Sequence, residues 1–116
     1  DQIIVLKEKD GERQFPIVIG FLEASSIKMK LSGVVPPRPL THDLLVSLFE
    51  TLDATVEWLY VDKVMNNTFH AKLKVITQSG EEKMIDTRPS DGIALAVRIG
   101  APIFVDEEVF NQTTVI

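Results

Sequence analysis

Hydrophobic residues at the start of the chain form two short runs with the composition of β-strands. Residues 3–6 and 15–19 are apolar and mostly β-branched, and they lie on either side of the turn pair Asp10-Gly11. This order is typical of a hairpin. Pro16 falls in the second run and has no amide hydrogen, so that strand is expected at the edge of a sheet.

A second group of runs predicts a three-stranded meander. Residues 56–64 and 68–77 are rich in residues that favour strands, and Asn66-Asn67 separates them. Apolar and polar side chains alternate from Phe69 onward, which gives that strand one face toward the core and one toward water. Residues 83–87 follow a Ser-Gly turn and form the third strand.

Helical spacing first occurs in residues 22–31, where the apolar residues fall into two stripes. One stripe contains Ile27, and the other contains Leu22 and Met29. One stripe can cover a sheet. The other then needs a cover, either another segment of the chain or a second subunit, and we expect a homo-oligomer, most simply a dimer.

Two further helices follow the same spacing. Thr41 is a natural N-cap for a helix with a clear apolar stripe, and Asp43 lies in its first turn, where a negative charge suits the helix dipole. Pro89 fits the first position of another helix, which Gly100 ends. That helix is apolar on almost every side, so it is expected to be buried.

Together these patterns predict an α+β fold. We expect a mixed, largely antiparallel sheet of about six strands packed with three to four helices. The last helix is short and begins near Asp106. A chain of 116 residues without a linker or repeat predicts a single domain over residues 1–116.

The amino-acid composition excludes several kinds of functional site. The chain has no cysteine, which excludes thiolate zinc sites, disulfides and cysteine nucleophiles. No apolar run is long enough to span a membrane, so we expect a cytoplasmic protein without membrane partners. The net charge of −5 argues against a protein whose main affinity is for the phosphate backbone, because that affinity requires clustered Lys and Arg.

Charged residues mark one edge of the helix that begins at Pro89. Asp86 and Arg88 precede it, Asp91 lies in its first turn, and Arg98 lies two turns further along the same side. Buried charges must be paired, so one interpretation is a structural ion-pair network that locks the helix to the meander. The other is that the two aspartates hold a divalent cation and Arg88 faces a phosphate.

Two long motifs are the most specific feature of the chain. They are PPRPLTHDL at residues 36–44 and DTRPSDGIALA at residues 86–96, and GAPI follows at residues 100–103. These motifs, with residues 16–24, resemble the bifunctional nuclease domain over nearly the whole chain. Gly92 departs from that family, which usually has alanine there. The resemblance implies an oligomeric α+β domain with nuclease activity on both RNA and DNA.

Side chains in these motifs suit the hydrolysis of a phosphodiester bond. The reaction needs an activated water, a proton for the leaving oxygen and positive charge near phosphorus. We expect the catalytic residues to be His42, Asp43 and Asp91, with His42 as acid or base.

The same motifs supply candidate ligands for a metal ion and a phosphate group. We expect Mg²⁺ or Mn²⁺ at Asp86 and Asp91, and no organic cofactor. Arg38 and Arg88 are the candidate phosphate-binding residues. The expected substrates are DNA and RNA.

A non-catalytic dimerisation or regulatory module is the alternative. In that case the motifs serve packing and ion-pair locking, Asp43 acts only on the helix dipole, and His42 is an interfacial residue. A third hypothesis is an anion-binding or small-molecule domain that uses the N-terminus of the helix at Pro89. His70 lies on the polar face of its strand and is expected to be solvated.

Overall fold

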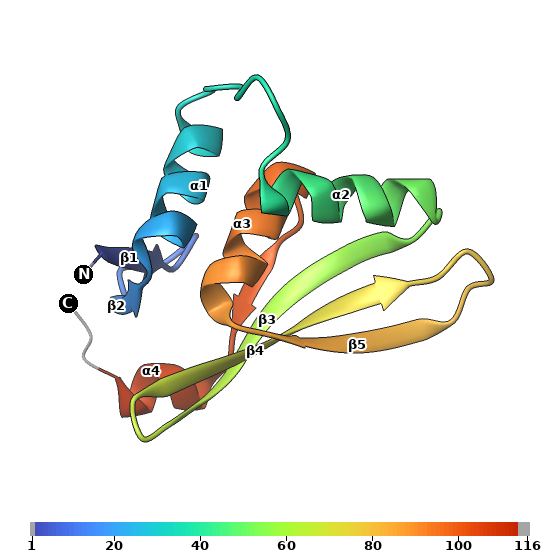
Figure 1. The fold of residues 1–116 in the computed structure, drawn as a ribbon. Helices are drawn as coiled ribbons and strands as arrows, with labels where there is room; N and C mark the ends of the chain where they lie inside the picture. Colours follow the sequence, from blue (N-terminus) through green and yellow to red (C-terminus); the bar gives the residue numbers. More distant parts are fainter. Residues whose placement is uncertain (1, 114–116) are drawn as a thin grey trace.

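The computed structural model describes residues 2–113, which form six strands and four helices (Figure 1). The strands are β1 (Gln2–Lys7), β2 (Gln14–Ile19), β3 (Thr55–Met65), β4 (Thr68–Ile76), β5 (Glu82–Thr87) and β6 (Ile103–Val105). The helices are α1 (Phe21–Leu31), α2 (Thr41–Thr51), α3 (Pro89–Ile99) and α4 (Glu107–Gln112). These elements confirm the predicted α+β class and the short last helix after Asp106. Within residues 2–113, no helix has both the length and the apolar character needed to cross a bilayer.

The strands divide into two sheets, whereas the sequence pattern predicted a single one. β1 and β2 pair with each other in an antiparallel two-stranded sheet, in which Pro16 lies opposite Val5. The edge position expected for Pro16 is confirmed. The other four strands have the order β5-β4-β3-β6, and only the pair β3 with β6 is parallel.

Helix α3 is the centre of the helical layer. It packs on β3 and β4, and both α1 and α2 pack against it (Figure 1). Residues that lie far apart along the chain therefore meet around α3. This arrangement brings the two sequence motifs together, because α2 carries most of one and α3 carries most of the other.

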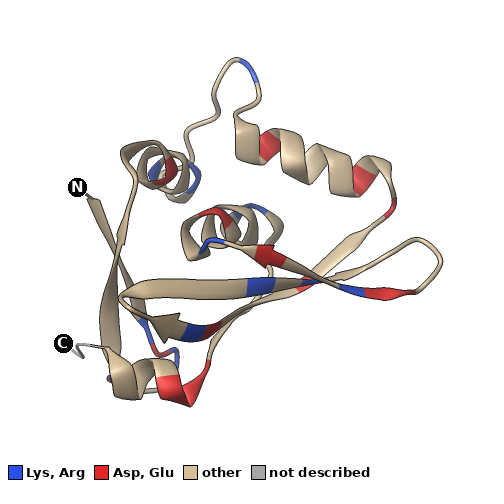
Figure 2. Cartoon of the chain, turned by 60° about the horizontal axis from the view of Figure 1, so that its bottom comes forward, with Lys and Arg blue, Asp and Glu red and all other residues tan. Residues whose placement is uncertain are grey.

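Basic and acidic residues are interspersed along the four-stranded sheet (Figure 2). Lys72 Nζ lies 3.0 Å from Asp62 Oδ2, and Lys74 Nζ lies 3.3 Å from Glu57 and 3.2 Å from Glu82. Strands with interspersed charge lack the one-sided positive field that concentrates a polyanion. Lys72 and Lys74 are thus each paired with a carboxylate on a neighbouring strand.

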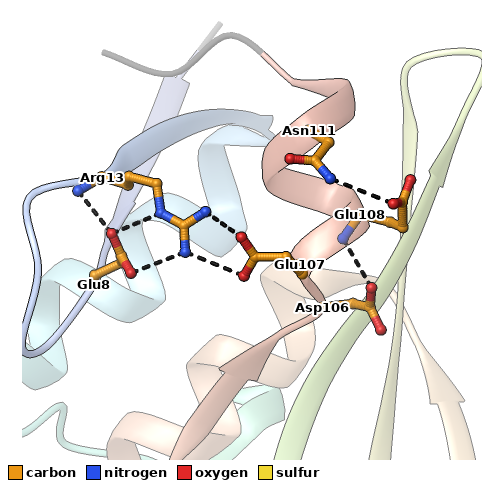
Figure 3. Close-up of polar contacts among 6 residues, drawn as sticks. All are labelled: Glu8, Arg13, Asp106, Glu107, Glu108 and Asn111. Atoms are coloured by element: carbon orange, nitrogen blue, oxygen red, sulfur yellow. Dashed lines mark hydrogen bonds and ion pairs between the residues drawn. The ribbon is translucent and has the colours of Figure 1, made fainter.

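Side chains fix the hairpin to the rest of the molecule. Phe15 is fully buried, and its ring centroid lies 5.8 Å from that of Phe69 and 5.1 Å from that of Phe110 on α4. Arg13 donates hydrogen bonds to Glu8 and Glu107 (Figure 3). Its guanidinium lies 4.2 Å from the centroid of the Phe110 ring. The hairpin is therefore joined by side chains to β4 and to α4, and Ile17 and Ile19 add to the common core.

The N-terminus of α2 differs from the predicted one. The N-cap is Leu40, so the prediction of Thr41 as N-cap is wrong. Leucine has no side-chain acceptor, and Asp43 supplies one instead, because its Oδ2 accepts a hydrogen bond from the Leu40 amide at 2.9 Å. Asp43 thus caps the helix directly, in addition to its favourable interaction with the helix dipole.

Helix α3 is buried on most sides, as its apolar sequence predicted. Gly92 permits its close approach to the sheet. A Cβ atom added to Gly92 would lie 2.5 Å from Leu59 Cδ1 on β3, and Leu59 is fully buried. The glycine at position 92 therefore serves packing between α3 and the sheet.

Gly92→Ala is expected to destabilise the fold, although alanine favours a helix by about 0.8–1.0 kcal/mol relative to glycine. The added methyl group overlaps Leu59, and overpacking of this kind typically lowers stability by about 1–3 kcal/mol. Urea unfolding measures the difference. In a Leu59→Ala background the same substitution should become stabilising, whereas a gain in stability in both backgrounds would contradict the packing argument.

Candidate functional site

A continuous network of hydrogen bonds joins α1, α2 and α3. The His42 ring lies between Ser26 and Asp91, with Nδ1 2.7 Å from Ser26 Oγ and Nε2 2.9 Å from Asp91 Oδ1. The Arg98 guanidinium donates to Ser26 Oγ at 2.8 Å and to Asp43 Oδ1 at 2.7 Å. We call these five residues the interhelical network. It contains all three residues that the sequence predicted to be catalytic.

Two of the bonds in this network have a fixed direction. A guanidinium can only donate and a carboxylate can only accept, so Ser26 Oγ accepts from Arg98 and His42 Nε2 donates to Asp91. Ser26 Oγ and His42 Nδ1 share a further hydrogen bond. His42 is 7% exposed, and both of its ring nitrogens are engaged. This geometry suits a residue that positions Asp91 rather than one that contacts a substrate.

Asp91 connects the buried network to the surface through Arg88. Arg88 Nε donates to Asp91 Oδ2 at 2.9 Å, and the side chain of Arg88 is 69% exposed while that of Asp91 is 30% exposed. Burial raises the pKa of Asp91, but the hydrogen bonds from His42 and Arg88 outweigh it, and the net pKa is lowered. Asp91 is therefore an anion at neutral pH, and it holds an exposed guanidinium at the start of α3.

Two clefts open on either side of this pair. One, of about 680 Å³, lies between α2, α3 and the strands β4 and β5, and the other, of about 350 Å³, lies between α1 and the starts of α2 and α3. His42, Arg88 and Asp91 line both clefts. The geometry thus brings three of the predicted site residues to one solvent-accessible place.

Asp86 lies close to this place but on a different face. It borders the larger cleft, yet its strand register pairs it with Lys72, whereas Ile85 and Thr87 lie on the face covered by α3. Both oxygens of Asp91 already accept hydrogen bonds. Among residues 2–113, no group of at least three His, Asp or Glu side chains is arranged to hold a metal ion. Metal binding at Asp86 and Asp91 stays a prediction.

Arg38 and His70 are not drawn into the network. Arg38 is exposed in the connector between α1 and α2, and it forms none of the hydrogen bonds or ion pairs found within the described part of the chain. Its role in phosphate binding stays a prediction. His70 is half-buried on β4, opposite Lys63 of β3.

Arg98 has a different partner from the one its spacing suggested. The sequence placed it on the same side of α3 as Asp91, but it pairs with Asp43 of α2 and also donates to the Ala94 carbonyl oxygen. Sequence reasoning missed Ser26 altogether. Its only signal was its place beside Ile27, in the stripe of α1 that faces the core.

The region in which this chain resembles known proteins includes all five residues of the interhelical network. A family model described as the bifunctional nuclease domain matches residues 4–116. An uncharacterized protein of Mycobacterium tuberculosis is 38% identical over 110 residues, and the alignment covers 95% of this chain and 65% of that protein.

Two plant proteins are more distant. Proteins named bifunctional nuclease 1 from Oryza sativa subsp. japonica and Arabidopsis thaliana are 28% and 27% identical over 111 and 107 residues. These alignments cover 91% and 90% of this chain but 33% of each plant protein. The chain thus spans 65% of the length of the mycobacterial relative and a third of the plant ones.

Ser26→Ala is expected to lower the free energy of unfolding by about 1–3 kcal/mol, because it removes a buried partner of both Arg98 and His42. Ser25→Ala on the same helix is the matched control, since both changes give the same gain in helix propensity. It should change stability by no more than about 0.5 kcal/mol. Equal urea midpoints for the two variants would show that the network adds nothing to stability.

Acid is expected to weaken the fold through Asp43. Hydrogen bonds from Arg98 and from the Leu40 amide lower the pKa of Asp43 below its ordinary 3.8. Such a group stabilises the folded state above its unfolded pKa, and this contribution is lost as the pH falls toward the folded value. The free energy of unfolding should therefore fall less steeply below about pH 4 in Asp43→Asn than in the unsubstituted chain. Urea titrations at a series of pH values measure the slopes, and identical slopes would contradict this account.

Proposed function

We propose that this chain, which belongs to the bifunctional nuclease domain family, hydrolyses phosphodiester bonds in DNA and RNA at the clefts lined by Arg88, Asp91 and His42. The observation that carries the proposal is the state of Arg88. It is a largely exposed guanidinium at the N-terminus of α3. Its hydrogen bond to Asp91 orients it, and His42 holds Asp91 in place. A fixed positive group beside an open cleft is what a phosphoryl transition state requires.

The residues have distinct roles in this proposal. Arg88 binds the scissile phosphate and stabilises the charge that develops on its oxygens, assisted by the positive end of the α3 dipole. Asp91 accepts a hydrogen bond from the attacking water and orients it, and its lowered pKa makes it a weak base. The proton of the attacking water therefore passes to solvent as the new P–O bond forms, and the leaving oxygen takes a proton from solvent as the old P–O bond breaks. His42 and Ser26 hold Asp91 in place and are positioning residues.

The dependence of cleavage on a divalent metal is a question for the assay. Asp91 would have to exchange a hydrogen-bond partner to offer an oxygen ligand, and Asp86, which borders the larger cleft, would have to turn its carboxylate toward Asp91. Mg²⁺ or Mn²⁺, when bound, would supply a Lewis acid for the phosphate oxygens. The roles given to Arg88 and Asp91 do not depend on it.

A dimerisation or regulatory module is the second candidate, and a specific observation favours it. Every member of the interhelical network already has a partner within the fold. In addition, Ile3 and Val18 are cross-strand neighbours with 61% and 66% exposure, and Phe21 and Leu22 at the start of α1 are 71% and 76% exposed. An apolar surface of this kind suits a second copy of the chain.

We expect the double variant Arg88→Ala/Asp91→Asn to lose nuclease activity by at least about 100-fold, the typical loss when a preorganised charge is removed from a transition state. Fluorescent single- and double-stranded DNA and RNA are the substrates. Each is incubated with highly purified protein in Mg²⁺, in Mn²⁺ and in chelator. The matched control is Lys9→Ala/Asp10→Asn, which makes the same charge changes in the exposed hairpin turn.

Folding and self-association are measured on the same preparations. Asp91→Asn alone should abolish cleavage in a chain that still unfolds cooperatively, with a lower urea midpoint because the carboxylate that accepts from His42 and Arg88 is lost. Unfolding of this variant would assign Asp91 to structure instead. If both double variants cut equally, or if the unsubstituted chain does not cut, the nuclease proposal is wrong. A dimer detected by sedimentation in that case would support the module.

A further inference from the structure

Three aromatic side chains gather on the face of the four-stranded sheet that α3 does not cover. Trp58 and Tyr60 alternate on β3 with the buried residues Leu59 and Val61, so they point to the opposite face. Phe104 of β6 lies in register with Tyr60 and is 51% exposed. This group lies apart from the interhelical network and has no role in the proposed hydrolysis.

The rings form the walls of a hollow. Its volume is about 300 Å³, and among residues 2–113 it is lined by Trp58, Tyr60 and Phe104. The Trp58 and Tyr60 rings are perpendicular, at 90°, with centroids 6.0 Å apart. This is an edge-to-face pair, and both rings also line the hollow beside Phe104. Aromatic ring faces carry negative polarisation, which attracts an organic cation.

Carboxylates outnumber lysines beside the hollow. Lys72 and Lys74 lie opposite Tyr60 and Trp58 on β4, and both are paired, Lys72 with Asp62 and Lys74 with Glu57 and Glu82. Asp106 accepts a hydrogen bond from the Tyr60 hydroxyl. Asp62 follows two residues after Tyr60, and its Oδ1 is buried without a hydrogen-bond partner within residues 2–113. The hydrogen bond to Asp106, burial, and the charges of Asp106 and Asp62 all raise the pKa of Tyr60. A phosphate-bearing ligand is therefore disfavoured here, and a cation is favoured.

The walls also select the kind of cation. They offer ring faces rather than acceptor atoms, so an ammonium with several N–H donors would lose its hydration without replacement. A trimethylated ammonium group has no N–H donor that needs an acceptor, and it is only weakly hydrated. Lys74 Nζ lies 5.8 Å from the centroid of Trp58, but Glu57 and Glu82 supply the acceptors for its N–H donors.

We propose that the hollow formed by Trp58, Tyr60 and Phe104 binds a methylated ammonium group. This group occurs in small molecules such as choline and in methylated lysine side chains. The two sources share the chemistry that the hollow recognises. The inference is independent of the nuclease proposal, because the two sites share no residue.

Trp58 is the only tryptophan of the chain, so its fluorescence reports directly on the hollow. Choline is titrated into the purified chain at constant ionic strength and should change the fluorescence saturably. Its uncharged isostere 3,3-dimethylbutan-1-ol should bind about threefold to thirtyfold more weakly, the range expected from the attraction between a cation and aromatic rings. A peptide with trimethyllysine is titrated in parallel, and the tighter of the two ligands identifies the source.

Phe104→Leu should weaken choline binding at least about threefold, because it removes one ring and keeps an apolar side chain. Phe21→Leu is the matched control, since Phe21 is 71% exposed on another surface. Equal affinity for choline and the isostere, an unchanged affinity in Phe104→Leu, or no saturable response to either cation would overturn the proposal. Tighter binding of adenosine than of choline would also overturn it and would identify a stacking surface for nucleobases.

Discussion

The burial of the Arg98 guanidinium constrains the arrangement of the helical layer. Its side chain is 6% exposed, and a buried charge without partners would destabilise the fold by several kcal/mol. The partners come from three helices: Asp43 from α2, Ser26 from α1, and the Ala94 carbonyl oxygen from α3 itself. Apolar contacts alone would tolerate small shifts between helices. These directional bonds do not, so they set the relative positions of α1, α2 and α3.

The network changes character along its length. At the Arg98 end it is buried and satisfied, whereas at the Arg88 end the guanidinium is 69% exposed beside two clefts. The interpretation as a structural lock therefore fits the Arg98 end of the network, and the proposed phosphate site lies at the Arg88 end. A rigid, buried end is also what holds an exposed charge at a defined place, which is the basis of electrostatic preorganisation.

The sequence predicted the elements better than the contacts between them. The hairpin, the meander and the apolar helix α3 follow from periodicity and turn residues, and the structure confirms them. The pairing of Arg98 with Asp43 depends on how α2 crosses α3, which no local pattern encodes. The position of Asp86 also could not be predicted from local sequence. The face of the sheet on which it lies depends on the register between β4 and β5. Ser26 gave almost no signal because serine is common on helices and acquires its role from neighbours distant in sequence.

The hairpin has a consequence for the motions of the molecule. The backbone ladder of β1 ends at β2, and Phe15 and Arg13 join this pair of strands to α4 through side chains. A cooperative unit attached in this way can open without breaking the ladder between β3 and β4. The amide hydrogens of the hairpin should then exchange with solvent at a rate different from those of β3 and β4. We therefore expect two regions that differ in their protection from hydrogen exchange.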